Sequence, residues 1–315
     1  MSEINRREFI AAVTTAATGT LGASCAMDTN AMADDSLGLS PIDAHVHVWT
    51  PDTDTYPLAE GYDKQSMKPA SFTPAELFAA CKPYSVDRIV LIQMSFYQYD
   101  NRYMIDTMKK HPGVFGGVAI VDSSRPDVAI RMSQLAEHGV RGFRLYANEK
   151  NTSGWATNDG INAMWRAGAD RNLAMCLLTD PESLPAIHQQ CERFPDTKVV
   201  IDHFARIGMT GTVNQKQLDQ LKALSKFKNL YVKTSAFYAL GNKRPPHTEL
   251  APMIRQLRDA FGADRLMWAS DCPFQLDNGN TYQSSIELIR DRIEFLNAAE
   301  KRSILQTTAE KLFFS

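Results

Sequence analysis

The sequence predicts an α/β protein built as a single (β/α)8 (TIM) barrel, and three observations lead to this prediction. The chain has 315 residues, of which 44% are hydrophobic and 22% charged, the composition of an ordinary globular protein. From residue 42 onward, short apolar runs alternate with amphipathic stretches, as in parallel β/α units. Eight apolar runs fit in the chain, and residues 34–315 have the length of one barrel domain.

Each predicted element follows from its own pattern of apolar residues. The predicted strands are 42–49, 88–93, 114–121, 140–146, 173–179, 198–203, 230–235 and 265–271. Helical patterns cover 74–81, 126–138, 162–172, 181–194, 215–225, 248–261 and 284–294. Several of them begin with Thr, Asp or Ser before Pro or Glu, which is how helices are capped. A last helix over 301–314 is expected to close the base of the barrel.

The first 33 residues are typical of an export signal. Arg6 and Arg7 precede a weakly apolar stretch, and Ala31 and Ala33 supply the small residues of a cleavage site. This order predicts twin-arginine export to the periplasm or beyond, with a signal peptide over 1–33 and a mature domain over 34–315. Two alternatives are an unstructured N-terminal arm and a lipid anchor attached through Cys25.

Charge and composition exclude several classes of function. The 34 basic and 36 acidic residues give a net charge of −2, so no basic excess is available for nucleic acid. No apolar run approaches the ~20 residues that span a bilayer. The four cysteines after residue 33 form no CxxC pair, which argues against a zinc ribbon or a redox motif.

The first predicted strand carries the strongest candidate site. In a regular strand Asp43, His45 and His47 share one face, while Ala44, Val46 and Val48 face the helices. Two imidazoles on one rigid face are well placed to bind one divalent metal ion. Burying both rings inside a barrel with nothing to bind would be costly.

Two other predicted strands end in candidate groups. The run 199–202 leads to His203, which could meet the first two imidazoles, and Arg206 could clamp an anion above the site. A structural histidine bonded to the backbone is the alternative. The last strand ends in Asp271, a candidate metal ligand and proton acceptor, while Ser270 is a candidate cap.

Four further polar residues lie at strand ends. Catalytic groups of a barrel occupy the C-terminal ends of its strands, so each could contact substrate, although packing and loop anchoring are equally open. They are Gln93, Arg144, Tyr146 and Lys233. The remaining histidines, His111, His138, His188 and His247, are predicted to lie on the surface. The GxGxxG, GxxxxGK[ST] and GxSxG motifs are all missing from the sequence.

Four segments together resemble the amidohydrolase-related family. They are Ile42-Asp43-Ala44-His45-Val46-His47, Asp202-His203-Phe204-Ala205-Arg206, Tyr231-Val232-Lys233-Thr234-Ser235 and Arg265-Leu266-Met267-Trp268-Ala269-Ser270-Asp271-Cys272-Pro273. The resemblance covers about residues 40–313. It is strongest to the lactonase-like branch of TIM-barrel hydrolases, which includes 2-pyrone-4,6-dicarboxylate lactonase and sugar lactonases.

The resemblance implies roles for the candidate residues. It implies that His45 and His47 are metal ligands, that His203 completes the site or polarises a carbonyl, and that Asp271 is the last ligand and proton shuttle. It also implies that Arg206 contacts a substrate anion. Arg144 or Tyr146 stands where two-metal relatives hold a lysine, and no histidine occurs in 175–179. Both departures favour at most one metal ion, and some relatives in this branch use none.

The expected function is hydrolysis of a lactone, or of a related ester or amide, with a small substrate that bears a carboxylate or lactone group. The expected cofactor is one divalent ion, zinc or alternatively manganese, with metal-free hydrolysis as an open alternative. A metal-dependent decarboxylase on the same barrel is the first alternative function, and a barrel that binds a ligand without turnover is the second. Homo-oligomer formation stays open.

Overall fold

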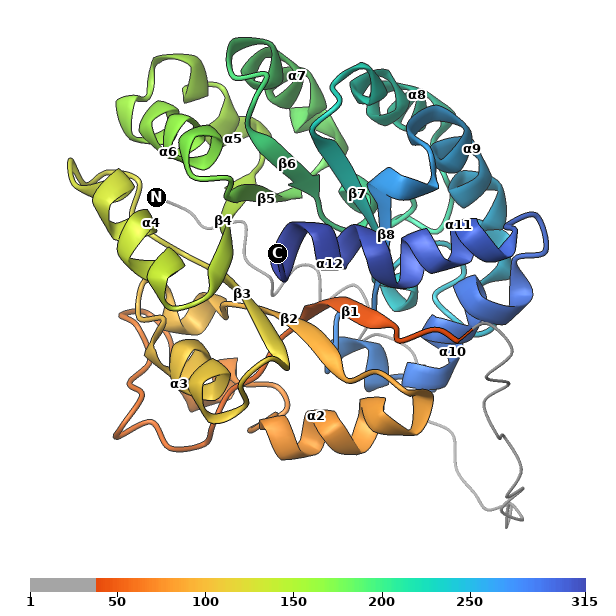
Figure 1. Ribbon diagram of the computed structural model, residues 1–315, viewed down its shortest axis with the longest axis horizontal. Helices are drawn as coiled ribbons and strands as arrows, with labels where there is room; N and C mark the ends of the chain where they lie inside the picture. Colours follow the sequence, from red (N-terminus) through yellow and green to blue (C-terminus); the bar gives the residue numbers. More distant parts are fainter. Residues whose placement is uncertain (1–37) are drawn as a thin grey trace. The chain divides into compact units, whose positions relative to one another are not determined.

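Eight parallel strands, hydrogen-bonded in chain order, form the central sheet of the computed structural model (Figure 1). The structure describes residues 38–315, so the predicted signal peptide and Cys25 lie outside the described residues. The strands are β1 Ile42–Val46, β2 Arg88–Ile92, β3 Phe115–Ala119, β4 Val140–Ala147, β5 Ala174–Thr179, β6 Lys198–Ile201, β7 Leu230–Ser235 and β8 Leu266–Ala269. The eight predicted strands and the barrel are therefore confirmed, with ends shifted by a few residues.

The barrel closes between its first and last strands. Val46 and Cys272 form a parallel bridge, and the His47 amide donates to the Cys272 carbonyl oxygen at 2.9 Å. The Asp271 amide donates to the His45 carbonyl oxygen, also at 2.9 Å. Closure therefore takes place at the C-terminal ends of the strands, where a barrel carries its chemistry.

Helices surround the sheet on its outer side (Figure 1). The α-helices are α2 Pro74–Cys81, α3 Arg102–Lys110, α4 Val128–Glu137, α5 Glu149–Thr152, α6 Asp159–Asp170, α7 Leu184–Arg193, α8 Gln215–Ala223, α9 Ala251–Phe261, α10 Tyr282–Glu287, α11 Ala298–Arg302 and α12 Thr308–Phe313. The π-helical segments are η13 Leu288–Arg292 and η14 Ser303–Thr307. No helix among residues 38–315 is both long and apolar enough to cross a bilayer.

Local signals explain where the helices begin. Thr73 caps α2 in a capping box with Glu76, with a proline in the first turn, as the sequence predicts. Helix α3 is missing from the prediction because only Met104, Thr107 and Met108 of its residues are buried, which gives a short apolar stripe.

Two apolar layers hold the barrel together. The inner layer consists of alternate strand residues, among them Ile42, Val90, Val200 and Met267, and the outer layer packs the strands against the helices. Phe313 of α12 joins the inner layer, so the C-terminal helix closes the base of the barrel as expected. The polar site therefore lies above a solid apolar core.

Candidate active site

Strand β1 brings two imidazoles into the barrel, but through an irregular strand. The register shifts between Asp43 and Val46, and Ala44 belongs to the inner layer whereas Val46 belongs to the outer one. A bulge of this kind changes which face the following side chains occupy. His45 lies within this irregular stretch and His47 follows it, and both fully buried rings reach the site together.

The prediction that Asp43 shares this face is wrong. Its carboxylate accepts hydrogen bonds from the Tyr282 hydroxyl at 2.8 Å and from the Ser270 amide at 2.9 Å, so it ties β1 to β8 and α10. Complete burial raises the pKa of Asp43 to about 6, against these hydrogen bonds, which lower it. Asp43 therefore stabilises the strands that carry the site and does not face the ligands.

The end of β6 aims His203 through an unusual turn. Residues 203–206 form the 3-10 turn η7 (His203–Arg206), and each has a positive φ between 53° and 60°. Left-handed backbone costs about 1–2 kcal/mol for each residue that carries a Cβ atom. Such strain persists only where the surrounding structure fixes it, and it is concentrated at functional sites.

Asp271 follows β8 in the same left-handed region, with a φ of 62°. Its Oδ2 accepts a hydrogen bond of 2.7 Å from the hydroxyl of Tyr238, which lies in the turn η9 Phe237–Ala239 after β7. The Cys272 amide donates to Ser270 Oγ at 3.0 Å, so Ser270 acts as a structural cap after β8. These contacts fix the direction of the carboxylate.

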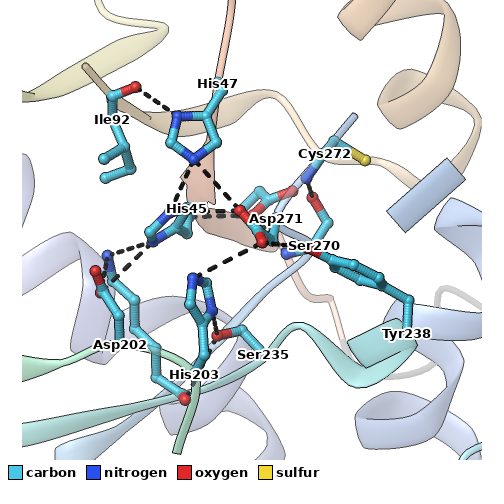
Figure 2. A network of polar contacts seen from close by, with 12 residues as sticks. His45, His47, Ile92, Asp202, His203, Ser235, Tyr238, Ser270, Asp271 and Cys272 are labelled. Atoms are coloured by element: carbon cyan, nitrogen blue, oxygen red, sulfur yellow. Dashed lines mark hydrogen bonds and ion pairs between the residues drawn. The ribbon is translucent and has the colours of Figure 1, made fainter. Parts of the chain in front are cut away.

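The predicted ligands meet at one point (Figure 2). One donor atom each from His45, His203 and Asp271 lies within 4.8 Å of the others. Oδ1 of Asp271 is 3.5 Å from Nε2 of His45 and 3.4 Å from Nε2 of His47, and its Oδ2 is 3.8 Å from Nε2 of His203. Three strands that are far apart in sequence thus supply one buried cluster.

The hydrogen bonds of Nδ1 determine the tautomers of His47 and His203. Nδ1–H of His47 donates to the Ile92 carbonyl oxygen at 2.8 Å, because a carbonyl can only accept. Nδ1 of His203 lies 2.8 Å from Ser235 Oγ, whose hydroxyl is directed toward the Lys233 carbonyl oxygen at 3.5 Å. In their neutral forms both rings therefore present the Nε2 lone pair to the centre of the site.

This donor set suits a divalent cation. The Nε2 lone pairs of His47 and His203 and the carboxylate of Asp271 are all acceptors that face one another at short distance. Acceptors converge in this way where a positive group is bound between them. Imidazole nitrogen and carboxylate oxygen are the ligands that zinc takes in catalytic sites.

Burial and neighbouring charges set the protonation states of His203 and Asp271. Burial lowers the pKa of His203 to about 4, although Asp271 and Asp202 partly oppose this shift. Burial alone would raise the pKa of Asp271, but His203, His47 and His45 hold it well below its usual value. At neutral pH His203 is therefore an uncharged ring and Asp271 a carboxylate that can accept a proton.

A second polar group lies on β4. Arg144 is 2% exposed, and its Nε and Nη1 have no hydrogen-bond partner among the described residues. Its guanidinium lies 5.2 Å from the ring of Tyr146, whose buried hydroxyl is also unpartnered within residues 38–315. A buried cation with unused donors is costly in the free protein, and this cost is typical of a site built for an anion.

The other predicted contact residues have different surroundings. Arg206 pairs with Asp180 at 2.8 Å and is partly exposed. Gln93 donates to the carbonyl oxygens of Gln98 and Asp100, so it anchors a loop. Lys233 is fully buried on β7.

Sequence reasoning missed three supporting residues and misplaced one. Asp202 lies 3.5 Å from Nδ1 of His45, Ser235 bonds His203, and Tyr238 bonds Asp271. The alternation of β7 puts Ser235 on the inner face, which was a usable signal, whereas no pattern indicates Tyr238. His247 was expected on the surface but is fully buried, because the loop that carries it packs its ring near Phe237.

Known proteins resemble this chain over most of its described length. The sequence profile of the amidohydrolase family matches residues 42–314. The chain is 27% identical to L-fucono-1,5-lactonase of Burkholderia ambifaria over 74% of this chain and 80% of the relative. It is 26% identical to 4-sulfomuconolactone hydrolase of Rhizobium radiobacter over 73% of this chain and 75% of that protein. It is also 27% identical to a 2-pyrone-4,6-dicarboxylate hydrolase of Comamonas testosteroni, over 75% and 78% of the two chains.

Solved structures share the barrel. A Burkholderia multivorans amidohydrolase with bound zinc superimposes with a TM-score of 0.73 at 20% identity, covering 87% of this chain and 99% of that one. A probable 2-pyrone-4,6-dicarboxylic acid hydrolase from Acinetobacter baumannii gives a TM-score of 0.71 at 21% identity, over 88% and 100% of the two chains. At these identities the structures show a common fold. The match of the family profile over residues 42–314, nearly all the described residues, establishes that this chain belongs to the amidohydrolase family.

Proposed function

We propose that this hydrolase opens a lactone ring by attack of water and uses one divalent ion, zinc or alternatively manganese. Three relatives with the names of lactone hydrolases support the substrate class. A structural neighbour with bound zinc supports the choice of metal. The ligands would be His45, His47, His203 and Asp271.

One observation carries the proposal. The carboxylate of Asp271 lies between 3.4 and 3.8 Å from the Nε2 atoms of three imidazoles, inside a site with no other carboxylate at that distance from all three among residues 38–315. A carboxylate at this position can take a proton from a water molecule bound between the rings and later give it to the leaving oxygen. Tyr238 keeps Oδ2 in a fixed direction on the side of His203, which leaves Oδ1 to face His45 and His47.

The chain's own residues then have separate tasks. A bound divalent ion supplies Lewis acidity, which lowers the pKa of water and polarises a carbonyl. Asp271 accepts the proton from the attacking water. His203, held by Ser235, keeps its Nε2 lone pair directed at the site. The burial of the cluster strengthens each of these electrostatic interactions.

We further propose that the substrate carries an anionic group and that Arg144 binds it. The two unused guanidinium donors of Arg144 can form the paired hydrogen bonds that a carboxylate or sulfonate accepts. The buried hydroxyl of Tyr146 offers a third donor beside them. Arg206 lies farther out, where its partner Asp180 already satisfies one of its donors, and it would contact substrate at the entrance.

The test is turnover of lactones by the purified protein. Sugar-acid 1,5-lactones and carboxylated or sulfonated muconolactones are incubated with zinc-loaded and metal-free enzyme, and acid release is recorded. Asp271→Asn is expected to lower kcat by about 10²- to 10⁴-fold. The matched variant Asp219→Asn, in a surface ion pair with Lys222, should keep wild-type activity.

Failure takes a defined form. Full activity of Asp271→Asn would remove Asp271 from the mechanism. Release of carbon dioxide without incorporation of ¹⁸O from labelled water would replace the lactonase by a decarboxylase.

We also propose that residues 1–33 direct export of the folded protein by the twin-arginine route. The paired arginines Arg6 and Arg7 and the small residues Ala31 and Ala33 support this. Changing both arginines to lysine should retain the protein in the cytoplasm with its N-terminus uncleaved. Labelling with palmitate that depends on Cys25 would instead support a lipid anchor.

A further inference from the structure

A buried ion pair beneath the candidate metal site has no place in the mechanism above. Lys233 and Asp202 are both completely buried, with Nζ of Lys233 3.1 Å from Oδ1 of Asp202. They lie on the inner face of the barrel, where β7 alternates Tyr231, Lys233 and Ser235 inward. Burying two charges is expensive, so their position next to a third residue needs a reason.

That third residue is His45. Its Nδ1 is 3.2 Å from Nζ of Lys233 and 3.5 Å from Oδ1 of Asp202. The same ring nitrogen therefore faces a group that can only donate a hydrogen bond and a group that can only accept one. This distinguishes His45 from His47 and His203, whose Nδ1 atoms face a carbonyl and a hydroxyl.

The hydrogen bonds around His45 have a defined direction without a cation. Nδ1–H of His47 donates to Ile92, so Nε2 of a neutral His47 is an acceptor. Nε2 of His45 lies 3.2 Å from that acceptor and 3.5 Å from Oδ1 of Asp271, and both acceptors favour a proton on Nε2. Nδ1 of His45 is then unprotonated and accepts from the ammonium of Lys233. The chain of donors runs from Lys233 through His45 and His47 to a carbonyl.

A cation reverses this arrangement at His45. To bind the ion through Nε2, the ring must carry its proton on Nδ1, and the acceptor at hand for that proton is Asp202. One proton leaves Nε2 to water and one arrives at Nδ1 from water. The charge of the ring and the oxidation state of every group stay the same.

We propose that the Asp202–Lys233 pair is a tautomer switch for His45. Lys233 stabilises the Nε2–H form in the metal-free site, and Asp202 stabilises the Nδ1–H form that binds the ion. The inference deepens the metal site of the proposed function and rests on it. In this proposal both residues act through their contacts with His45, so they are positioning residues.

The first measurement is the ¹⁵N spectrum of the histidine rings, with His45 assigned by its loss in His45→Gln. The metal-free wild type should show His45 protonated on Nε2, and zinc should move the proton to Nδ1. Lys233→Met removes the donor to Nδ1 and leaves Asp202 as its neighbour, so the share of the Nδ1–H form in the metal-free protein should rise above that of the wild type. A metal-free wild-type ring protonated on Nδ1 would overturn the proposal.

The second measurement is zinc affinity, by competition with a chromophoric chelator. Asp202→Ala should weaken zinc binding by about 10- to 100-fold, as loss of a ligand's outer hydrogen bond does. Asp202→Asn keeps an acceptor oxygen and should restore most of the affinity. Lys233→Met should bind zinc at least as tightly as wild type.

A neutral double variant separates tautomer control from simple charge. Lys233→Met with Asp202→Leu removes both charges, and replacing a buried pair by apolar residues of similar volume usually preserves folding. If the pair acts through charge alone, its net charge of zero is unchanged and zinc affinity stays at the wild-type value. The proposal instead predicts the 10- to 100-fold loss seen in Asp202→Ala.

The outcomes also distinguish this inference from the lactonase proposal. Wild-type protein that binds no zinc overturns the tautomer switch, whatever it does to lactones. Wild-type protein that binds zinc with the expected change at His45 but opens no lactone overturns only the proposed function.

Discussion

At the scale of single residues, Arg144 is a buried cation whose unsatisfied hydrogen-bond donors lower the stability of the free protein. Its buried guanidinium leaves Nε and Nη1 without partners among the described residues. Arg265 is the matched contrast, since it donates to the carbonyl oxygens of Phe261, Ser225 and Phe227. Arg265 uses its donors within the fold, whereas Arg144 has two donors that no described residue accepts.

The two arginines should therefore respond in opposite ways to replacement by methionine. Arg144→Met is expected to lower kcat/KM for an anionic lactone by about 10- to 100-fold, because a hydrogen bond to a charged group contributes about 1.5–3 kcal/mol. Its melting temperature should not fall. Arg265→Met should keep activity and lose stability, since three carbonyl oxygens lose their donor. Loss of stability in Arg144→Met with unchanged kinetics would show that Arg144 is structural.

The shifted pKa values of Asp43 and His203 predict opposite effects of pH on the free energy of unfolding. The pKa of Asp43 is raised to about 6, so its contribution is present at low pH and is lost as pH rises from 3.8 through 6. The pKa of His203 is lowered to about 4, so its contribution is present above 6.5 and is lost as pH falls toward 4. The two contributions partly cancel in the acid range.

Asp43→Asn removes the pH-dependent contribution of Asp43 to stability and should reveal that of His203. Asparagine resembles the protonated carboxyl, so the stability difference between variant and wild type should change in favour of the variant as pH rises from 4 to 7. A shift of about two pKa units corresponds to a change on the order of 3 kcal/mol. Urea unfolding at several pH values measures it. Parallel curves for the two proteins would contradict the assignment.

At the scale of elements, the turn after β6 is held in a backbone conformation that its residues disfavour. Ala205, fully buried, has a φ of 53°. Ala205→Gly should therefore leave stability unchanged or raise it by about 1 kcal/mol, because glycine removes the left-handed penalty. Ala174→Gly, in the regular strand β5, is the control and should cost about 1 kcal/mol. Thermal unfolding of both decides the matter, and equal losses would mean that the turn stores no strain.

The same elements show how far sequence could predict the structure. Eight strands were predictable because each is a short apolar run that alternates with amphipathic stretches. The direction of Asp43 was not, because a bulge in β1 depends on how that strand meets β2 and β8. The meeting of His45, His203 and Asp271 was predictable from strand ends, since parallel strands converge there. Tyr238 was not, because its position depends on the path of the turn after β7.

At the scale of the whole molecule, the site lies where the barrel closes. His45 lies in the first strand and Asp271 follows the last one, and the Asp271 amide donates to the His45 carbonyl oxygen. His203 adds a third strand end from the opposite part of the sequence. An ion bound by these groups would link His45 to two segments that each lie more than 150 residues farther along the chain. Its binding free energy would then stabilise the entire barrel, because the unfolded chain cannot assemble the ligands.

Zinc removal should therefore lower the stability of the whole domain as well as activity. Zinc at 100 times its dissociation constant adds about 2.7 kcal/mol to the free energy of unfolding, which corresponds to a rise in melting temperature of about 5–10 °C for a domain of this size. The comparison is between chelator-treated protein and the same protein reloaded with zinc, in a single calorimetric transition. His45→Ala should lose the rise, and magnesium, which prefers oxygen ligands, should not produce it. An unchanged melting temperature with zinc bound would mean that the ion lies elsewhere than across this closure.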